Sequence, residues 1–369
     1  MSYKLFTSES VAAGHPDKIA DAISDALLDA ILTQDKTART GLETIVGADT
    51  IGLFGEIKTT AKVDFELVAR KTIRKLGYTN PNWNFSDKST IINNIHQQSP
   101  EISIGVDNDG AGDQGMMFGY ACDETPELMP LPITLAHALT RRLDEVRETG
   151  VLDYIRPDGK SQVTVGYEND KPVTIEKVVL AVAHTEEKDY SELQKGLVTE
   201  VINPVLEKYG YSVKENQITI NGTGLWHIPG PDTDAGLTGR KIVVDGYGGY
   251  ARVGGGAFSG KDPSKVDRSG AYAARYIAKN IVAKGLASRC EVALAYVIGQ
   301  AQPQMKSFDT FGTESVSLDE IQQFLDELLD TSVKGIIDKL DLRQPIYSST
   351  TAYGHFGKDY LPWEQIIAN

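Results

Sequence analysis

The first quarter of the chain alternates between helix-like and strand-like patterns of apolar residues. Residues 16–32 place six apolar side chains on one face at helical spacing. Pro16 suits the first helical position, where its missing N–H costs nothing. Residues 43–59 alternate around a Gly-Ala-Asp turn, which is typical of a β-hairpin. Residues 64–76 predict a second helix with Asp64 as its N-cap.

The rest of the chain continues this mixture of helices and hairpins. Helices are predicted from Pro132 to about Arg147, over 190–209 with a kink at Pro204, from Pro263 onward, and after the capping box Ser317–Glu320. Strands are predicted in a hairpin over 161–183 and at 217–221, 241–245 and 290–299, whereas 99–115 is a loop by composition. Hairpins mixed with long helices favour an α+β fold over a doubly wound sheet.

Two of the predicted helix starts share a short sequence pattern. Residues 15–19 and 262–266 both have the form X-Pro-X-Lys-aliphatic. Such an internal echo indicates a duplicated unit, although common rules for beginning a helix would also produce it. Asp17 falls in the first turn of one helix, and Asp267 falls one turn into the other.

Composition indicates a protein of several domains with no membrane segment. The 369 residues are too many for one ordinary core, and 41% of them are apolar. No apolar run approaches the roughly 18 residues of a membrane span, and the N-terminus lacks the apolar stretch of a secretory signal. Cys122 and Cys290 are the only cysteines, which fits a reducing compartment. We therefore expect a cytoplasmic location.

Charge is distributed unevenly along the chain. The net charge is −14, which argues against a nucleic-acid partner. Residues 240–268 nevertheless hold six basic and three acidic side chains. A local excess of cations in an acidic protein indicates a small polyanionic ligand, although a solvated basic loop is an equally simple interpretation.

The glycine-rich stretch within this segment nearly forms a P-loop. Gly255, Gly260 and Lys261 have the P-loop spacing, but Asp262 stands where Ser or Thr should bind Mg²⁺, and Pro263 removes an N–H donor. Lysines 261 and 265 can still hold phosphate as point charges. Asp17 and Asp267 are candidate Mg²⁺ ligands, because Mg²⁺ uses one or two carboxylates with phosphates and water. A first-turn aspartate more often only complements the helix dipole.

The longest motifs resemble those of S-adenosylmethionine synthetases. The sequences GAGDQGMMFGYA at 110–121 and GGGAFSGKDPSKVDRS at 254–269 carry the resemblance, and 8–26, 156–164 and 236–242 support it. It covers essentially the whole chain. The resemblance implies an enzyme that joins ATP and L-methionine. In that reaction the methionine sulfur attacks C5′ of ATP and expels triphosphate, which the same site hydrolyses to pyrophosphate and phosphate.

The resemblance also implies a fold and an assembly. We expect three α+β domains with approximate threefold pseudosymmetry, over residues 1–99, 110–229 and 230–369, with 99–109 as a loop that gates the active site. The expected assembly is a homodimer with shared active sites that pairs further into a tetramer. The expected cofactors are Mg²⁺ and K⁺, and neither nucleic acid nor membrane is an expected partner.

Roles for single residues follow from the same resemblance. Cations on the phosphates are expected at Lys160, Arg240, Lys241, Lys261 and Lys265, and His15 is expected beside the bond that breaks. Further ATP contacts are expected at Asp158, Trp226, Asp234 and Ala257. Methionine contacts are expected at Glu56, Gln98, Asp113, Asp234 and Lys265. Metal ligands are expected at Asp17 for Mg²⁺, Asp267 in the magnesium region and Glu43 for K⁺.

Leu225 and Trp226 depart from the family pattern, which usually has a basic residue followed by phenylalanine at the adenine position. Nucleotide selectivity therefore remains open. Two other functions are also open. A P-loop kinase or NTPase would release ADP or a phosphorylated acceptor, and a sensor would bind ATP or S-adenosylmethionine without turnover.

Overall fold

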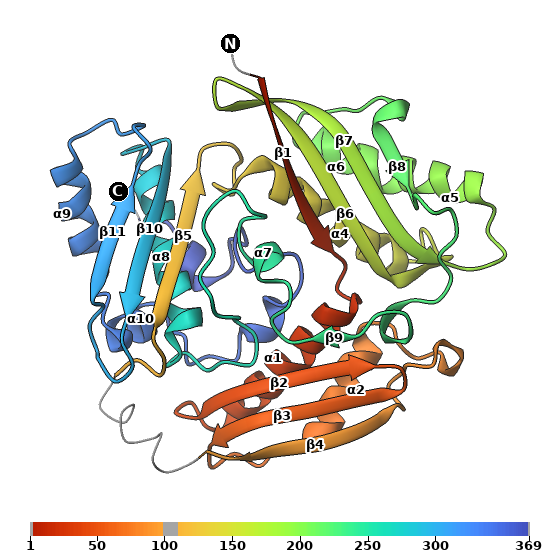
Figure 1. The fold of residues 1–369 in the computed structure, drawn as a ribbon, viewed down its shortest axis with the longest axis horizontal. Coiled ribbons are helices and arrows are strands. Elements are labelled where there is room, and N and C mark those ends of the chain that lie inside the picture. The colour runs from red at the N-terminus through yellow and green to blue at the C-terminus, as the bar shows by residue number, and fades with distance from the viewer. Residues whose placement is uncertain (1–2, 99–109, 368–369) are drawn as a thin grey trace.

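The chain folds into three β-sheets, each backed by helices (Figure 1). The computed structural model describes residues 3–98 and 110–367, so the predicted gating loop 99–109 lies outside the described residues. The first sheet has the order β1 (Tyr3–Val11), β6 (Ile155–Glu168), β7 (Lys171–His184) and β8 (Ile218–Ile220). The second has the order β11 (Met305–Asp309), β10 (Arg289–Tyr296) and β5 (Gly115–Cys122). The third has the order β4 (Thr90–Gln97), β3 (Thr50–Lys58), β2 (Arg39–Gly47) and β9 (Gly236–Leu237).

Each sheet carries its own set of helices. The first sheet is packed by α4 (Leu131–Glu148), α5 (Tyr190–Leu197) and α6 (Asn203–Lys208). The second is packed by α8 (Val266–Ala283), with α9 (Leu318–Leu328) and α10 (Val333–Lys339) against that helix. The third is packed by α1 (Pro16–Gln34) and α2 (Phe65–Lys75). The short helix α7 (Ile242–Asp245) lies between the sheets, near the centre of Figure 1. The α+β prediction is confirmed.

Every sheet includes one strand from a distant part of the chain. β1 leads directly into α1, yet it pairs antiparallel with β6 of the first sheet, with Val11 opposite Lys160. β5 pairs with β10, and β9 pairs with β2. The first sheet thus takes the strand that precedes α1, the second takes the strand that precedes α4, and the third takes a strand that precedes α8. These exchanges link the three sheets in a ring. They place the segments between a strand and its following helix, such as residues 12–15, at the junctions between sheets.

Most predicted elements are confirmed, because their signals are local. The helices predicted at 16–32, 64–76 and after Pro132, the hairpins at 43–59 and 161–183, the strand at 217–221 and the helix after the Ser317 capping box are all present. The Asp64 side chain accepts from the Leu67 amide as an N-cap. The helix over 190–209 is interrupted by a π-turn at Val198–Ile202, just before Pro204, which cannot donate to a helical partner. β10 ends at Tyr296, three residues before the predicted end of its strand.

The strand predicted at 241–245 is wrong, because residues Ile242–Asp245 form helix α7. Val244 and Asp245 are both buried whereas Val243 is 44% exposed, so burial does not alternate as in a strand. The Asp245 carboxylate pairs with Lys18 of α1 inside the protein. This distant ion pair overrides the strand preference of the β-branched residues.

The start predicted for the long helix is also wrong, since α8 begins at Val266 and not at Pro263. Residues 262–265 form a turn closed by the Lys265 amide, which donates to the Asp262 carbonyl at 3.0 Å. The turn before α1 is closed in the same way, by the His15 amide and the Ala12 carbonyl at 3.1 Å. The two helix starts therefore correspond, but the sequence pattern aligned His15 with Asp262, three residues before its structural counterpart. Lys265 corresponds to His15, and Asp267 corresponds to Asp17.

Helices α1 and α8 are joined by a buried ion pair. Both guanidinium Nη atoms of Arg268 donate to the Asp25 carboxylate at 2.7 Å, and Asp25 also accepts from the Gly260 amide at 2.8 Å. Both side chains are fully buried. The pair fixes the glycine loop before α8 against α1.

Among the described helices, none combines the length and apolar character that a membrane span requires.

Removal of one partner of this pair should destabilise the fold strongly. We expect Asp25→Asn to lower the free energy of unfolding by about 3–5 kcal/mol, because it leaves the Arg268 charge buried without a counter-ion. Urea denaturation at fixed protein concentration measures the change. The control is Glu145→Gln, which breaks the exposed pair with Arg142 and should cost under about 1 kcal/mol. Equal costs for the two variants would contradict the prediction.

Candidate active site

One group of predicted site residues gathers at the N-terminus of α1. His15 is the N-cap and is 1% exposed, and its Nδ1 accepts from the Asp17 amide at 3.2 Å. Burial, followed by the nearby charges of Lys241 and Lys160, lowers the pKa of His15 to about 3. The imidazole is therefore neutral near pH 7. Because Nδ1 accepts a hydrogen bond, the proton lies on Nε2.

Asp17 joins this helix start to the segment that follows β9. Its Oδ1 accepts from the Leu237 amide at 3.0 Å, its Oδ2 pairs closely with Lys241 Nζ, and Arg240 Nε lies 3.9 Å from the carboxylate. Burial alone would raise the pKa of Asp17, but the hydrogen bonds from Lys241 and Leu237 outweigh it and hold the pKa below its usual value. The carboxylate is ionised and holds two cations beside His15.

The β6 strand borders the same group. Asp158 is buried and accepts from the Gly230 amide at 2.9 Å, and burial raises its pKa to about 7. Lys160 lies two residues on and is exposed. Gly14 packs directly on Pro157, where an added Cβ would overlap the proline backbone. This contact presses the turn before α1 against the strand that carries Asp158 and Lys160.

A second group surrounds the first turn of α8. Lys261 Nζ lies 2.6 Å from Asp267 Oδ2, and Lys265 Nζ lies 3.3 Å from Asp262 Oδ2. Gly256 packs so closely on Asp267 that any Cβ there would overlap the carboxylate. The glycine-rich stretch therefore packs against Asp267 and places Lys261 within ion-pair distance of it.

The residues predicted to bind methionine lie around this second group. Gly112 donates to the Ser264 carbonyl at 3.0 Å, which places the loop that contains Asp113 against the α8 turn. Glu56 lies over Gly41, whose backbone pairs with that of Lys261. Gln98 follows β4, and its Oε1 is buried without a hydrogen-bond partner in the described part of the chain.

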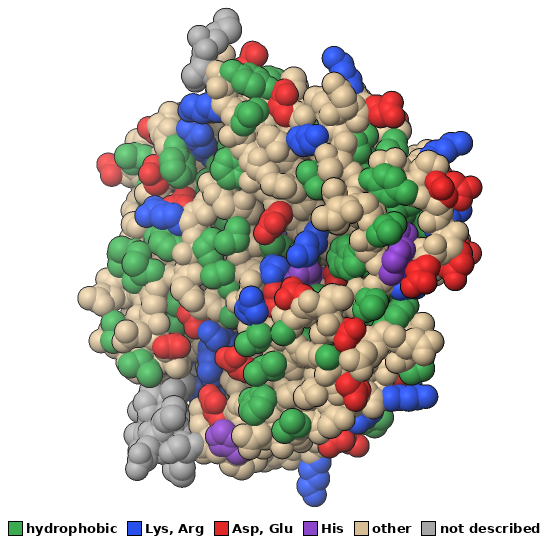
Figure 2. Space-filling model, turned by 45° about the vertical axis from the view of Figure 1, so that its right-hand side comes forward, with side chains coloured by type: hydrophobic (Ala, Val, Ile, Leu, Met, Phe, Trp, Pro, Cys, Tyr) green, Lys and Arg blue, Asp and Glu red, His purple; other side chains and the backbone are tan. Residues whose placement is uncertain are grey.

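The two groups lie apart within one chain. Asp17 marks the first group on α1, and Asp25, which binds the Gly260 amide beside the second group, lies eight residues further along that helix. At a rise of 1.5 Å per residue this is about 12 Å. Ala257 connects the groups by packing on Gly239. Figure 2 shows basic, acidic and histidine side chains gathered near the middle of one face.

Three predicted site residues stand outside both groups. Glu43 on β2 and Asp234 before β9 are exposed, and neither has a resolved partner among the described contacts. Trp226 is half-buried, and its indole Nε1 donates to the Ile228 carbonyl at 2.9 Å. Its ring is thereby held in one orientation.

Not every cation of the basic segment 240–268 is available to a ligand. Arg268 is committed to Asp25, and Arg252 pairs with Glu291 at 2.5 Å. The excess of positive charge that indicated an anionic ligand therefore includes two arginines that have structural partners.

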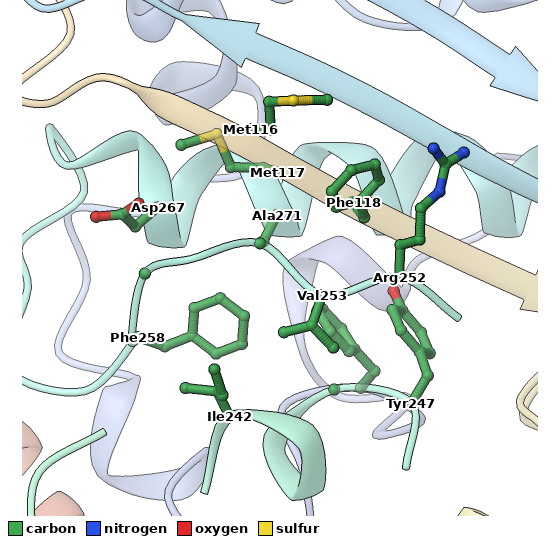
Figure 3. A pocket seen from close by; sticks show the side chains of 14 residues that line it. Met116, Met117, Phe118, Ile242, Tyr247, Arg252, Val253, Phe258, Asp267 and Ala271 are labelled. Carbon is green, nitrogen blue, oxygen red and sulfur yellow. The ribbon is translucent and has the colours of Figure 1, made fainter. Parts of the chain in front are cut away.

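The pocket in Figure 3 lies between β5, α7, α8 and the glycine-rich segment. Its wall is largely apolar, with Met117, Ile242 and Phe258 facing the space and Asp267 at one end. The cavity measures about 20 Å³, which is room for about one water molecule. Figure 3 shows the Asp267 carboxylate pointing away from the Phe258 ring. The pocket therefore supports the site rather than holding a substrate.

Sequence reasoning missed the buried charges that support the first group. Lys18 is 1% exposed and pairs with Asp21 at 2.9 Å and closely with Asp245. Asp245 ends α7, the helix that begins immediately after Lys241. The signal was a Lys-x-x-Asp spacing inside an apolar helix, which places both charges on adjacent turns of a buried face.

Comparison with known families accounts for nearly the whole chain. The model of the N-terminal domain of S-adenosylmethionine synthetase matches residues 3–100, that of the central domain 108–226 and that of the C-terminal domain 228–365. These matches confirm the resemblance in the motifs. Members of the family act on ATP and methionine and use Mg²⁺ and K⁺. The chain therefore belongs to the S-adenosylmethionine synthetase family, whose members form S-adenosylmethionine from ATP and methionine.

Proposed function

We propose that the two groups of charged residues are the two parts of one catalytic site, in which the methionine sulfur attacks C5′ of ATP and triphosphate leaves. One observation carries the proposal. Asp17 and Asp267 occupy corresponding positions in the first turns of α1 and α8, and each is paired with a lysine, Lys241 or Lys261. Each helix start thus offers a cation for phosphate and a carboxylate for a metal.

The leaving group explains the need for so many cations. Triphosphate gains negative charge as the C–O bond breaks, and preorganised cations stabilise that charge most effectively. We assign this role to Lys160, Arg240, Lys241, Lys261 and Lys265. Without substrate, lysines 241 and 261 are held by aspartates. A bound triphosphate would compete for these lysines and release carboxylate oxygens.

The carboxylates fit a magnesium ion that arrives with the nucleotide. No cluster of three His, Cys, Asp or Glu side chains that could hold a metal occurs among the described residues. Asp17 and Asp267 each supply one carboxylate, and Mg²⁺ commonly takes one or two, with phosphates and water as its other ligands. When bound, Mg²⁺ neutralises phosphate charge. Glu43 is the proposed K⁺ ligand.

His15 is proposed to act on the oxygen that leaves C5′. Its neutral ring keeps a proton on Nε2, which can donate a hydrogen bond to that oxygen as its charge develops. The thioether sulfur is already nucleophilic, so the first step requires no general base. The chain must instead align sulfur, carbon and leaving oxygen.

The remaining contacts divide between the two substrates. We assign Asp158, Trp226, Asp234 and Ala257 to the nucleoside and its phosphates, because Ala257 and Asp158 border the first group. We assign Glu56, Gln98, Asp113, Asp234 and Lys265 to methionine. The buried Oε1 of Gln98, which has no hydrogen-bond partner among the described residues, supports this assignment, since a substrate ammonium would satisfy it. Residues 1–99, 110–229 and 230–369 are the proposed domains.

We further propose a homodimer in which the first group of one copy faces the second group of its partner, with dimers pairing into a tetramer. The helix rise of about 12 Å from Asp17 to Asp25, which contacts the loop of the second group at Gly260, supports a shared site. Exposed apolar side chains on β1, β4 and β2 also support association, since Leu5 is 60%, Ile92 52% and Ile45 43% exposed. A twofold axis would form two identical sites.

Product analysis tests the reaction directly. Purified protein incubated with ATP, L-methionine, Mg²⁺ and K⁺ should yield S-adenosylmethionine, pyrophosphate and phosphate in mass spectra, and only when methionine is present. ADP without S-adenosylmethionine would instead support a kinase. Binding of ATP with no product would indicate a sensor.

Lys261→Ala should reduce turnover far more than it weakens methionine binding. We expect kcat to fall about 100-fold or more, as when one charge-stabilising donor is removed from an active site, with KM for methionine nearly unchanged. Steady-state kinetics give both constants. Lys88→Ala, at an exposed lysine outside the site, is the control and should match the unaltered enzyme. Similar losses in kcat and methionine affinity would refute the role of Lys261.

Mixed dimers test the shared site. His15→Ala and Lys261→Ala chains should each be inactive alone. Co-expressed in equal amounts, they should recover about a quarter of the unaltered activity, because half the dimers are mixed and each mixed dimer has one intact site. If both groups acted within one chain, mixing would restore nothing. The mixed dimer purified with two affinity tags, in which one site of two is intact, should show about half of the unaltered activity.

A further inference from the structure

A large cleft opens among the helices, apart from the small pocket of Figure 3. It lies between α1, α2, α4 and the segment 348–360, and its volume is about 540 Å³. Sites for small organic ligands commonly measure about 300–1,000 Å³. Small side chains on α1, Ala22 and Ala26, leave the space open.

Helix α1 separates this cleft from the catalytic groups. Successive residues of a helix are about 100° apart, so Ala26 lies about 180° around the helix axis from Asp17. Asp17 faces Leu237 and Lys241, whereas Ala26 lines the cleft. The cleft therefore lies on the opposite side of α1 from Asp17, and it adjoins the turn that carries His15 only through the small residue Ala13.

Positive charge surrounds the opening. Lys71 and Lys75 lie one turn apart on α2, and neither makes a hydrogen bond or ion pair through its ammonium group with the described residues. Arg141 of α4 lies opposite, with its guanidinium 5.3 Å from the centre of the Tyr353 ring. The acid that lines the cleft, Glu148, is already paired with Arg147 at 3.1 Å.

A buried ammonium lies at the inner wall. Lys358 is 5% exposed, and its Nζ donates to the carbonyls of Ser349 at 2.9 Å and Ala352 at 2.7 Å. Its described hydrogen-bond partners are all neutral carbonyls, and burial lowers its pKa to about 7 although the charges of Asp245 and Glu364 act to raise it. A buried cation whose partners are neutral is stabilised by an anion brought close to it.

The remaining wall combines apolar side chains with the hydroxyl residues Thr72, Ser348, Ser349 and Thr351, and it includes two aromatic rings. Leu76 and the two alanines of α1 line one side, and Tyr353 and Tyr360 line the other. Tyr360 is 62% exposed, with its hydroxyl 3.3 Å from the Ser349 carbonyl. Flat rings beside cations favour a ligand with a flat apolar body and an anionic group.

We propose that this cleft is a binding site for a flat aromatic anion, with the ring system between Tyr353, Tyr360 and α1 and the anionic group toward Lys71, Lys75 and Arg141. The site is independent of the proposed catalytic groups.

The probe is 8-anilinonaphthalene-1-sulfonate, a flat aromatic sulfonate whose fluorescence rises on binding. Full-length protein is titrated in the presence of a saturating non-hydrolysable ATP analogue, which occupies the catalytic site. We expect saturable binding, and the double variant Lys71→Glu/Lys75→Glu should weaken it at least tenfold. The matched control, Lys62→Glu/Lys88→Glu, makes the same change of net charge at exposed lysines outside the cleft and should leave binding unchanged.

A steric variant gives an independent test. Ala26→Phe places a ring in the cleft without altering charge, and it should also abolish probe binding while S-adenosylmethionine formation persists. Loss of the probe on addition of the ATP analogue would overturn the proposal, and so would unchanged affinity in both cleft variants. An equal loss in the control variant would attribute binding to general surface charge and would also overturn it.

Discussion

The buried pairing of Arg268 with Asp25 is the constraint on which the rest of the molecule depends. It locks the start of α8 against the middle of α1, and a bidentate pair allows little rotation or sliding. Because Asp25 also binds the Gly260 amide, the glycine-rich segment is fixed in the same contact. Two hydrophobic surfaces could slide past one another and still bury the same area, but this pair defines a single register. The positions of Asp17 and Asp267, the two proposed metal-binding aspartates, relative to each other follow from it.

The aspartate that breaks the P-loop pattern has a structural explanation. Asp262 accepts hydrogen bonds from the amides of Thr40 and Ser264 and pairs with Lys265. It anchors the loop to β2, whereas the hydroxyl of a P-loop serves the metal directly. In the proposed site, the metal-binding role of that hydroxyl passes to Asp267, in the first turn of α8. The glycine-rich loop would then bind phosphate while Asp262 ties it to β2.

The parts of the fold that were predictable from sequence depend on neighbouring residues. Caps such as Asp64 and Ser317, hairpin turns and helical periodicity all act within a few residues, so the pattern reveals them. Residues 241–245 were predicted as a strand but contain helix α7, because Asp245 forms a buried ion pair with Lys18, more than two hundred residues away in the sequence. The strand exchange leaves no mark in the periodicity, since alternation shows that a strand has a buried face but not which strand lies beside it. For the site, motifs indicated the residues, while the burial of His15 and the separation into two groups required the fold.

The ring of exchanged strands has a consequence for how the enzyme is made. β1 meets β6 across roughly 150 residues of chain, and contacts of such long range form late in folding because a large loop must first be closed. During synthesis, the turn that carries His15 leaves the ribosome early. The strand that packs beside it, β6, is synthesised only later. The turn that carries His15 is therefore complete only after β6 has paired with β1. A chain that ends before β6 should for this reason consume no ATP, without the need for any inhibitor.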